Sequence, residues 1–301
     1  MKDREDKTTS FVSNVKKIDI HAHVVPKSKK SLSSWVDDEV VLNLYDKLNI
    51  EKGVVLPFLK SGDDTCEMTN DNAKLVTEMY PKQFLRFASV DLNCCDNLYE
   101  FLSIEKEKGA LGVGEITSNV YFDDEKVDCL FSVCEILEFP VLFHMSPAIE
   151  NGYGLVDDLG LPRLEKMLAK YPKVNVIGHS QPFWCEISKI DSETNRNAYP
   201  KGKIFEGRLP ELMRKFKNLY CDLSAGSGAN AMMRDMEYAA KFFTEFGDRI
   251  LYGCDITSAE STYPFAFAEF LDNLYINNMI SRKTYKNICR DNAIKLLQIQ
   301  P

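Results

Sequence analysis

The chain contains only four histidines, and their positions suggest that they work together. His21 and His23 lie two residues apart in the segment Ile-Asp-Ile-His-Ala-His, and His144 and His179 each come at the end of a short apolar run. Side chains two residues apart on a β-strand point to the same face, so His21 and His23 can reach one cation together. Imidazole is a common ligand of zinc and other transition metals. The pattern therefore predicts a metal site.

A carboxylate is the expected companion of these imidazoles. Asp255 ends the segment Leu-Tyr-Gly-Cys-Asp, which again follows an apolar run. Three histidines with one aspartate suit zinc first and manganese or iron next, and they leave room for a water molecule if the metal is five-coordinate. We therefore expect one divalent metal ion, with zinc favoured.

Glu115, in the segment Gly-Val-Gly-Glu-Ile, is a further candidate whose role the sequence leaves open. Its carboxylate can bridge to a second metal ion, hydrogen-bond a ligand histidine, or pair with Arg86. The flanking Gly112 and Gly114 would allow a close approach to the centre of the protein.

The elements that position these residues follow a regular pattern. Eight apolar runs rich in β-branched residues are each followed by a segment with helical spacing, which is typical of βα units and a parallel sheet. Eight such units favour a closed TIM-type (β/α)8 barrel over an open sheet. The expected strands span residues 16–23, 52–58, 84–91, 111–117, 141–146, 174–180, 218–225 and 250–257.

A barrel would bring the candidate residues together, because barrel active sites lie at the carboxyl ends of the strands. All four histidines fall in the later part of a predicted strand, and the eighth strand, with Asp255, closes beside the first. A chain of 301 residues fits one such domain. We expect a single α/β barrel over residues 16–301, preceded by a loose N-terminal extension over residues 1–15.

Composition bears on partners and location. The net charge is −8, and no basic run with interleaved aromatic residues occurs, so nucleic acid is not an expected partner. No segment approaches the roughly 20 apolar residues of a membrane span, and the first ten residues lack a signal-like apolar stretch. We expect a cytoplasmic enzyme with a small-molecule substrate, and barrels of this kind commonly form homo-oligomers.

The nine cysteines lack C-x2-C spacing and are expected to be reduced thiols rather than metal ligands.

Two connections are longer than a barrel needs, one after Ser146 and one over residues 181–207. Both follow predicted strand ends, so we interpret them as substrate-covering loops, although plain surface insertions would have the same length. Phe183, Trp184 and Arg208 are candidates for binding an aromatic or carboxylated substrate, although ordinary loop packing would explain them equally well.

The motifs at 18–23, 143–144, 177–179 and 251–255 together resemble those of the amidohydrolase superfamily. The similar branch contains aminocarboxymuconate-semialdehyde decarboxylase and uncharacterised predicted metal-dependent hydrolases, and the resemblance covers nearly the whole chain. It implies that His21, His23, His144 and Asp255 hold the metal and that His179 lies beside the catalytic water or the substrate oxygen. The fifth predicted strand has no lysine, so the carbamylated-lysine bridge of binuclear relatives is not implied.

The expected activity is hydrolysis of a C–N or C–O bond in a small molecule by a metal-activated water, with Asp255 as general base and His179 stabilising the oxyanion or carrying the proton. The alternative is a lyase, either a non-oxidative decarboxylase or a hydratase, that uses the same mononuclear site. In decarboxylases of the branch Tyr-Pro often follows the last metal-ligating aspartate, and the Ile256-Thr257-Ser258 found here favours hydrolysis. A barrel that only binds a ligand would be expected to lack part of the ligand set, which is complete here.

Overall fold

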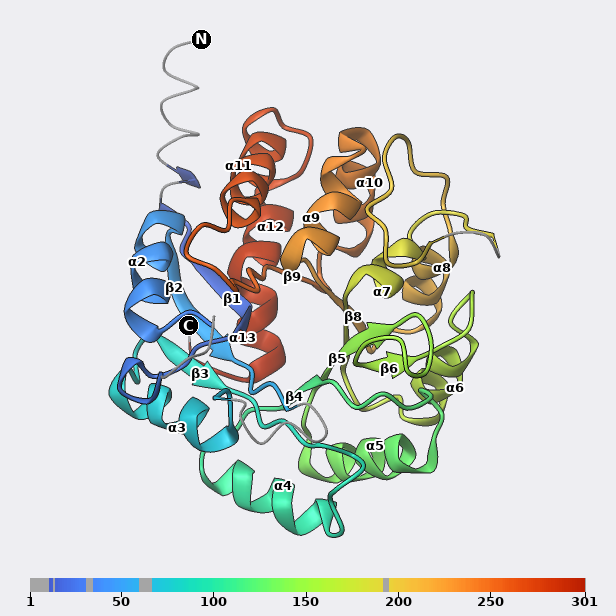
Figure 1. Cartoon of the computed structure of the whole chain (residues 1–301). Helices are drawn as coiled ribbons and strands as arrows, with labels where there is room; N and C mark the ends of the chain where they lie inside the picture. Colours follow the sequence, from blue (N-terminus) through green and yellow to red (C-terminus); the bar gives the residue numbers. More distant parts are fainter. Residues whose placement is uncertain (1–10, 13, 31–34, 60–66, 192–194, 301) are drawn as a thin grey trace.

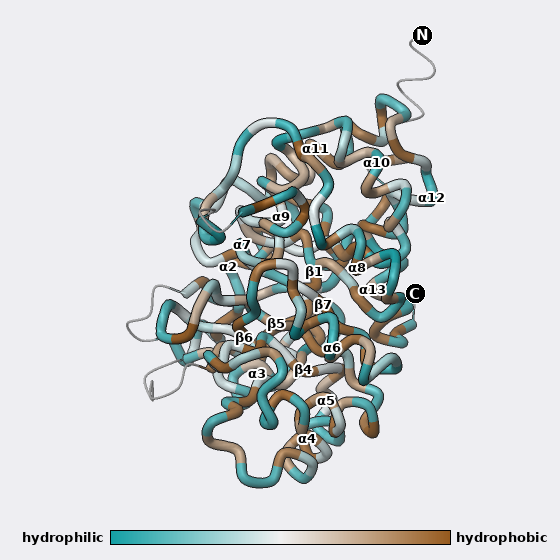
Figure 2. Tube along the Cα trace, turned by 90° about the vertical axis from the view of Figure 1, so that its right-hand side faces the viewer, coloured by the Kyte–Doolittle hydropathy of each residue, from teal (hydrophilic) through white to brown (hydrophobic). Residues whose placement is uncertain are grey.

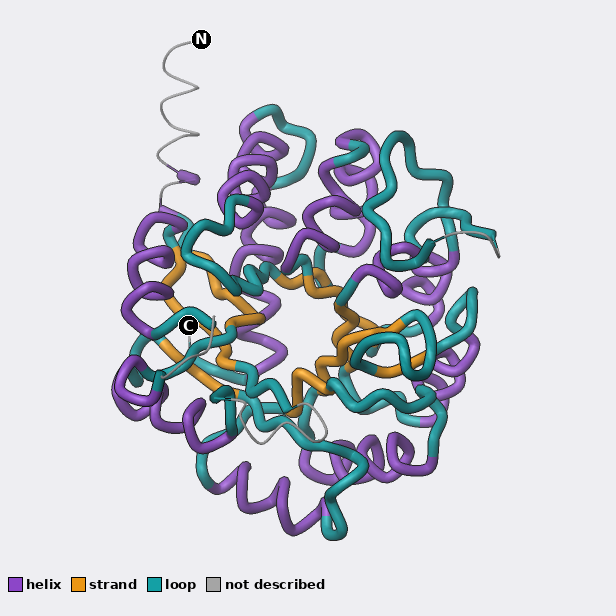
Figure 3. The backbone as a smooth tube through the Cα atoms, in the orientation of Figure 1, coloured by secondary structure: helices purple, strands orange, loops and turns teal. Residues whose placement is uncertain are grey.

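The computed structural model describes residues 11, 12, 14–30, 35–59, 67–191 and 195–300, and its strands form a ring surrounded by helices (Figure 1 and Figure 3). This arrangement confirms the predicted TIM-type barrel in one domain. Eight strands build the ring, and a short ninth, β6 (Leu155–Val156), pairs with β5 outside it. The ring strands are β1 (Lys17–Ala22), β2 (Ile50–Val55), β3 (Phe84–Arg86), β4 (Val113–Ile116), β5 (Val141–Ser146), β7 (Val176–His179), β8 (Leu219–Asp222) and β9 (Ile250–Leu251).

The ring consists of two parallel ladders that are joined at both ends. The first runs β1-β2-β3 and the second β4-β5-β7-β8-β9. A parallel bridge between Ala88 and Val113 connects the chain after β3 to β4. On the other side the backbone N–H of Ile20 donates to the carbonyl of Tyr252 at 3.0 Å, and that of Asp255 donates to the carbonyl of His21 at 2.8 Å. The last bond places Asp255 directly beside the histidine pair.

The helices cover the outside of the ring, and several begin at residues whose side chains cap the first turn. Asp37, Thr69, Asn97 and Asp124 each accept a hydrogen bond from a backbone N–H of the helix that follows. The helices are α2 (Asp38–Leu48), α3 (Asn70–Met79), α4 (Leu98–Glu107), α5 (Glu125–Leu137), α6 (Pro162–Lys170), α7 (Gln181–Cys185), α8 (Arg208–Lys215), α9 (Ala225–Met233), α10 (Met236–Phe246), α11 (Tyr263–Ile276), α12 (Arg282–Lys286) and α13 (Asn292–Leu297), with a 3-10 turn at Lys27–Lys29 and a π-turn at Asn287–Asp291.

The apolar side chains form two layers. A large cluster fills the space between strands and helices, and a smaller one fills the inside of the ring around Ile20, Phe87 and Leu142. Leu296 and Leu297 of α13 belong to the inner cluster, so the C-terminal helix closes one end of the barrel. Seen from the side, the strands lie in the middle of the molecule, with α4 and α5 below them and α10 and α11 above them (Figure 2).

The N-terminal extension is partly packed. Residues 1–10 and 13 lie outside the described residues, whereas the ring of Phe11 lies 5.1 Å from that of Tyr275 and Val15 is buried. The packed part of the chain therefore begins before residue 16. Of the nine cysteines, the eight within the described residues are free thiols, as expected. Within the same residues no helix is both long and apolar enough to cross a membrane.

Candidate metal centre

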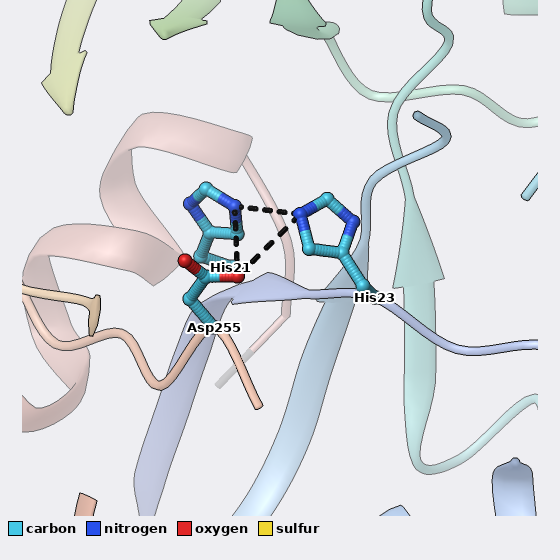
Figure 4. Close-up of side chains that lie close together, drawn as sticks. All are labelled: His21, His23 and Asp255. Carbon is cyan, nitrogen blue, oxygen red and sulfur yellow. Dashed lines mark hydrogen bonds and ion pairs between the residues drawn. The ribbon is translucent and has the colours of Figure 1, made fainter. Parts of the chain in front are cut away.

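The end of β1 presents His21 and His23 to the same point. Their Nε2 atoms lie 3.0 Å apart, and both side chains are buried (Figure 4). The other ring nitrogen of each imidazole makes a hydrogen bond. Nδ1 of His21 lies 2.7 Å from a carboxylate oxygen of Asp222, and Nδ1 of His23 lies 3.0 Å from the carbonyl oxygen of Leu56. Both acceptors lack a proton, so each Nδ1 carries the hydrogen and donates it.

This hydrogen bonding determines what the pair can bind. In a neutral imidazole with a protonated Nδ1, Nε2 carries a lone pair. Two lone pairs that face each other at 3.0 Å repel, so the pair takes up either a proton, as a hydrogen bond between the two Nε2 atoms, or a metal cation. Histidines that bind a divalent metal usually donate their other ring N–H to a carboxylate or a backbone carbonyl. The residues present therefore fit a divalent cation.

Asp255 supplies the nearest partly exposed carboxylate. Its Oδ1 atom lies 3.8 Å from Nε2 of His21 and 3.6 Å from Nε2 of His23 (Figure 4). The residue follows β9 with a φ of 54°, a left-handed conformation that few residues other than glycine adopt. The hydroxyl of Tyr263 donates to its carbonyl oxygen, and its side chain is 17% exposed, so the carboxylate faces the open end of the site.

Glu115, on β4, lies among the histidines. Its Oε2 atom is 3.4 Å from Nε2 of His23 and its Oε1 atom accepts a hydrogen bond from Nδ1 of His144 at 2.8 Å. Burial opposes its charged form, but the neighbouring imidazoles, His144 first, hold the pKa of this carboxyl well below its usual range. Arg86 donates to Glu105 instead, at 2.8 Å, so the proposed Arg86–Glu115 pair is wrong: Arg86 points outward, to α4.

Two groups of ligand atoms lie close enough for one ion within the described residues. One contains His21, His23 and Asp255, and the other contains His21, Glu115 and His179. His144 belongs to neither, although its Nδ1 atom lies 2.8 Å from a carboxylate oxygen of Glu115. A metal-ligating role for His144 therefore stays a prediction, and the structure offers Glu115 and His179 as neighbouring donors.

Asp222 and Ser224, which follow each other closely at the end of β8, are functional candidates that the sequence analysis missed. Oδ2 of Asp222 contacts Nδ1 of His21 at 2.7 Å and Nδ1 of His179 at 3.1 Å, and accepts from the hydroxyl of Ser224 at 2.6 Å. One buried carboxylate thus orients two imidazoles. The available signal was an acidic residue at the end of the seventh apolar run, on the same rim as the histidines.

The carboxylates and imidazoles of the site shift one another's pKa values. Burial disfavours a protonated His21, but the carboxylates of Asp255 and Asp222 outweigh it and raise its pKa to about 10. For Asp222, burial is opposed by His21 and His179, which hold its pKa well below the usual value. Three carboxylates around the imidazoles thus stabilise a positive charge at their centre, which a divalent ion would supply.

The three residues that the sequence analysis named as candidates for substrate binding are engaged in contacts within the protein. Phe183 is fully buried against Gly178, where a Cβ atom would strike its ring, and Trp184 donates its indole N–H to the carbonyl of Asp222 at 2.9 Å. Arg208 binds Glu165 and Glu211 at the side of the barrel. Packing and ion pairing explain these three positions, so their contact with substrate stays a prediction.

Other aromatic side chains stand around the histidines. Trp35 and Phe58 lie 5.5 and 5.9 Å from the ring of His23, and Tyr153 lies 4.2 Å from that of His144, all between ring centroids. Phe58 and Tyr153 also contact each other, at 5.0 Å. We call Trp35, Phe58 and Tyr153 the aromatic arc. The sequence contained no signal for it, because its members come from three separate loops.

The long connection after Ser146 positions Tyr153. Gly154 has a φ of 104°, and a Cβ atom there would meet the carbonyl carbon of His144 at 2.7 Å. Only glycine allows the loop to approach β5 this closely, with Tyr153 over the imidazole. The expectation that this loop covers the substrate stays a prediction, with Tyr153 as its contact.

A parallel barrel with clustered imidazoles and carboxylates at the carboxyl ends of its strands defines a class of metal-dependent barrel enzymes. The chain matches the model of the amidohydrolase family over residues 18–299 and belongs to that family. It is therefore an enzyme of the amidohydrolase superfamily, as the motifs indicated. No curated protein sequence matches it significantly.

Solved structures with the same fold are similar over nearly the whole chain. A 2,6-dihydroxybenzoate decarboxylase from Rhizobium is 16% identical, with a TM-score of 0.60 over 94% of this chain and 98% of the other. A 5-carboxyvanillate decarboxylase from Novosphingobium aromaticivorans, complexed with manganese and a nitrobenzoic acid, is 15% identical, with a TM-score of 0.61 over 95% and 97%. A probable 2-pyrone-4,6-dicarboxylic acid hydrolase from Acinetobacter baumannii is 15% identical, with a TM-score of 0.58 over 94% and 99%.

Proposed function

We propose that this enzyme catalyses the metal-dependent, non-oxidative decarboxylation of a small planar carboxylic acid. The observation that carries the proposal is the aromatic arc beside the imidazole cluster, since flat aromatic walls suit an aromatic or conjugated ring. The decarboxylases with the same fold act on such acids, according to their names. Decarboxylation was the alternative in the sequence analysis, and the comparisons support it better than hydrolysis.

The proposed metal site consists of His21, His23 and Asp255, with Glu115 and His179 as neighbouring donors. When bound, the divalent ion would act as a Lewis acid for substrate oxygens. Manganese has the support of a similar structure, and the imidazole-rich donors suit zinc as well.

The proposed chemistry assigns a proton to Asp255. Its carboxylate, 17% exposed at the open end of the cluster, takes up a proton from solvent and delivers it to the ring carbon that carries the substrate carboxylate. The bond from this carbon to the carboxylate then breaks, its electron pair stays with the ring, carbon dioxide leaves and the ring regains its conjugation. His179 turns Nε2 toward the same space, because Ser224 and Asp222 hold its Nδ1, and it orients a substrate oxygen.

Hydrolysis is the second candidate, and one similar structure favours it, that of the probable dicarboxylic acid hydrolase. There Asp255 would accept a proton from water instead of giving one to carbon, and His179 would stabilise the developing oxyanion. The same site residues serve both reactions, so the products discriminate between them.

Product analysis tests the proposal. Protein loaded with manganese or zinc is incubated with carboxyl-13C hydroxybenzoates and related planar acids, and in parallel with amides and lactones of similar size. We expect labelled carbon dioxide and the ring product that lacks the carboxyl group. Cleavage of amides or lactones without carbon dioxide release would contradict decarboxylation.

Two variants test whether the measured activity comes from this site or from a contaminating enzyme. The Asp255→Asn variant keeps the size of the side chain but cannot transfer the proton, so we expect no labelled carbon dioxide. Glu260→Gln removes a carboxylate on the exposed loop that follows and leaves the activity unchanged. Equal activity in both variants would show that the activity does not come from this site.

A further inference from the structure

Few backbone hydrogen bonds hold the ring where its first and last strands meet. β9 contains only two residues, and among the described residues it pairs with β8 but forms no ladder with β1. Within the same residues two backbone bonds cross from β1 to the chain after β9, one between Ile20 and Tyr252 and one between Asp255 and His21. We call this place the seam, and in Figure 1 it lies between β1 and β9. The proposed metal site spans the seam, because His21 and His23 come from one side and Asp255 from the other.

A buried carboxylate joins the two sides of the seam. Oδ1 of Asp19 accepts a hydrogen bond from the backbone N–H of His21 at 3.0 Å and another from the backbone N–H of Cys254 at 2.8 Å. Asp19 is fully buried, and it lies 235 positions from Cys254 in the sequence. One oxygen atom thus holds a metal-site histidine and the residue that directly precedes Asp255.

Helix α2 holds the carboxylate of Asp19 in turn. The hydroxyl of Tyr45 donates to Oδ2 of Asp19 at 2.7 Å, and Tyr45 is buried. This hydroxyl lies against Gly53, which pairs with Asp19 in the ladder between β1 and β2. A Cβ atom at Gly53 would strike the Tyr45 hydroxyl, so the contact requires glycine at this position. Both oxygens of Asp19 are therefore engaged.

Asp19 acts from behind the metal site. It belongs to neither group of ligand atoms within the described residues that lie close enough for one ion. Burial raises the pKa of this carboxyl to about 7, against the effect of the three groups that donate to it. Charged or neutral, Oδ1 has lone pairs for the two backbone hydrogens, so the contacts across the seam do not depend on the charge.

The two bonds to Oδ1 favour one spacing across the seam, because a buried backbone N–H that loses its acceptor costs free energy. Metal affinity depends on this spacing, since a site binds best when its ligands are already held at the right distance. We propose that Asp19, held by Tyr45, is a positioning residue that sets the distance between His21 and Asp255 and thereby the affinity for the metal. The inference rests on the metal site of the proposed function.

The test measures zinc affinity and stability separately, by competition with a chromophoric chelator and by denaturant unfolding. Asp19→Ala removes the acceptor on both sides of the seam, and we expect zinc binding to weaken at least about tenfold. Asp19→Asn keeps an oxygen for the two backbone hydrogens, and its amide can donate to the Tyr45 oxygen, so we expect affinity within about twofold of the wild type. An equally large loss in both variants would indicate an effect of charge and overturn the proposal.

A matched control separates positioning from stability. Asp157→Ala also removes a buried carboxylate that accepts from backbone N–H groups, those of Arg163 and Leu164 at the start of α6. We expect this variant to lose stability and to bind zinc like the wild type. Unchanged zinc affinity in Asp19→Ala, with only its stability reduced, would make Asp19 merely structural and overturn the proposal.

A milder variant decides the question if Asp19→Ala does not fold. Tyr45→Phe keeps the ring and removes only the hydroxyl that holds Oδ2, and we expect zinc binding to weaken at least about threefold, as for the loss of one hydrogen bond. Unchanged affinity in this variant would then overturn the proposal. Wild-type protein that binds no zinc or manganese would instead contradict the proposed metal site itself, so the two failures are distinguishable.

Discussion

The imidazole cluster and Arg234, at the end of α9, both contain buried nitrogen atoms, but they differ in where the hydrogens are. At the cluster, the Nδ1 hydrogens of His21 and His23 are bound to Asp222 and to the Leu56 carbonyl, so the two Nε2 atoms offer lone pairs to a proton or a metal ion. At Arg234, the donors Nε and Nη2 are buried without an acceptor among the described residues. The first arrangement is complementary to a cation, whereas the second consists of donors that a single water molecule can satisfy.

The largest expected effect follows from the lone pairs of the cluster. We expect the His21→Ala, His23→Ala double variant to lose its bound metal and its activity, because it removes the two facing lone pairs. Elemental analysis of the purified variant and of the wild type measures this. Two metal equivalents in the wild type would indicate that Glu115 bridges a second ion.

The four histidines of the chain all lie in or beside the site, so 15N-histidine spectra report on it alone. Metal added to metal-free wild type is expected to shift the Nε2 signals of His21 and His23 and to leave their Nδ1 protonated. A protonated Nε2 with bare Nδ1 in either residue would contradict the hydrogen bonds described for the cluster.

The second expected effect concerns the acceptor behind the imidazoles. Asp222→Asn exchanges the carboxylate for an amide, and we expect metal affinity to fall by about 10- to 100-fold, as for other residues that orient ligand histidines. Competition with a chromophoric chelator measures the affinity. Asp157→Asn is the matched control, since this buried carboxylate caps α6 through Arg163 and Leu164. Equal metal affinity in both variants would show that Asp222 does not orient the ligands.

A smaller effect is expected at the wall of the cluster. Tyr153→Leu removes the ring over His144, and we expect KM for a planar acid to rise by about tenfold with metal content unchanged, since ring contacts contribute on the order of 1 kcal/mol. Steady-state kinetics and metal analysis measure the two quantities. Tyr99→Leu, at a tyrosine that is 51% exposed on α4, is the control. An unchanged KM in Tyr153→Leu would remove the support that the aromatic arc gives to a planar substrate.

The smallest expected effect is at Arg234. Arg234→Met is expected to change the free energy of unfolding by less than about 0.5 kcal/mol, because Nε and Nη2, which form one edge of the guanidinium group, make no hydrogen bonds within the described residues. Arg249→Met, which removes bonds to three carbonyls, is expected to cost about 1–3 kcal/mol. Denaturant unfolding of both variants measures the difference, and a large loss in Arg234→Met would show that the edge is already paired.

Much of the barrel could be predicted because its strands are apolar runs between helical segments, a signal that each segment carries locally. The outlying β6 and the two-residue β9 were not predicted in that form, since short pairings depend on the neighbouring strand. The positions of His21, His23 and Asp255 at one rim were equally readable, because residue spacing and strand order determine them.

Other parts depended on contacts between distant segments. Asp222 lies 201 residues from the imidazole that it holds, and the aromatic arc joins loops from separate parts of the chain. The same holds for the unpaired edge of Arg234, because a buried donor without an acceptor is a property of the packed surroundings. Thus the sequence by itself determined the barrel and the rim on which its ligand residues lie, since both follow from local periodicity. Only the tertiary structure decided which nitrogens offer lone pairs and which keep unpaired hydrogens, because hydrogen-bond partners come together only when the chain is folded.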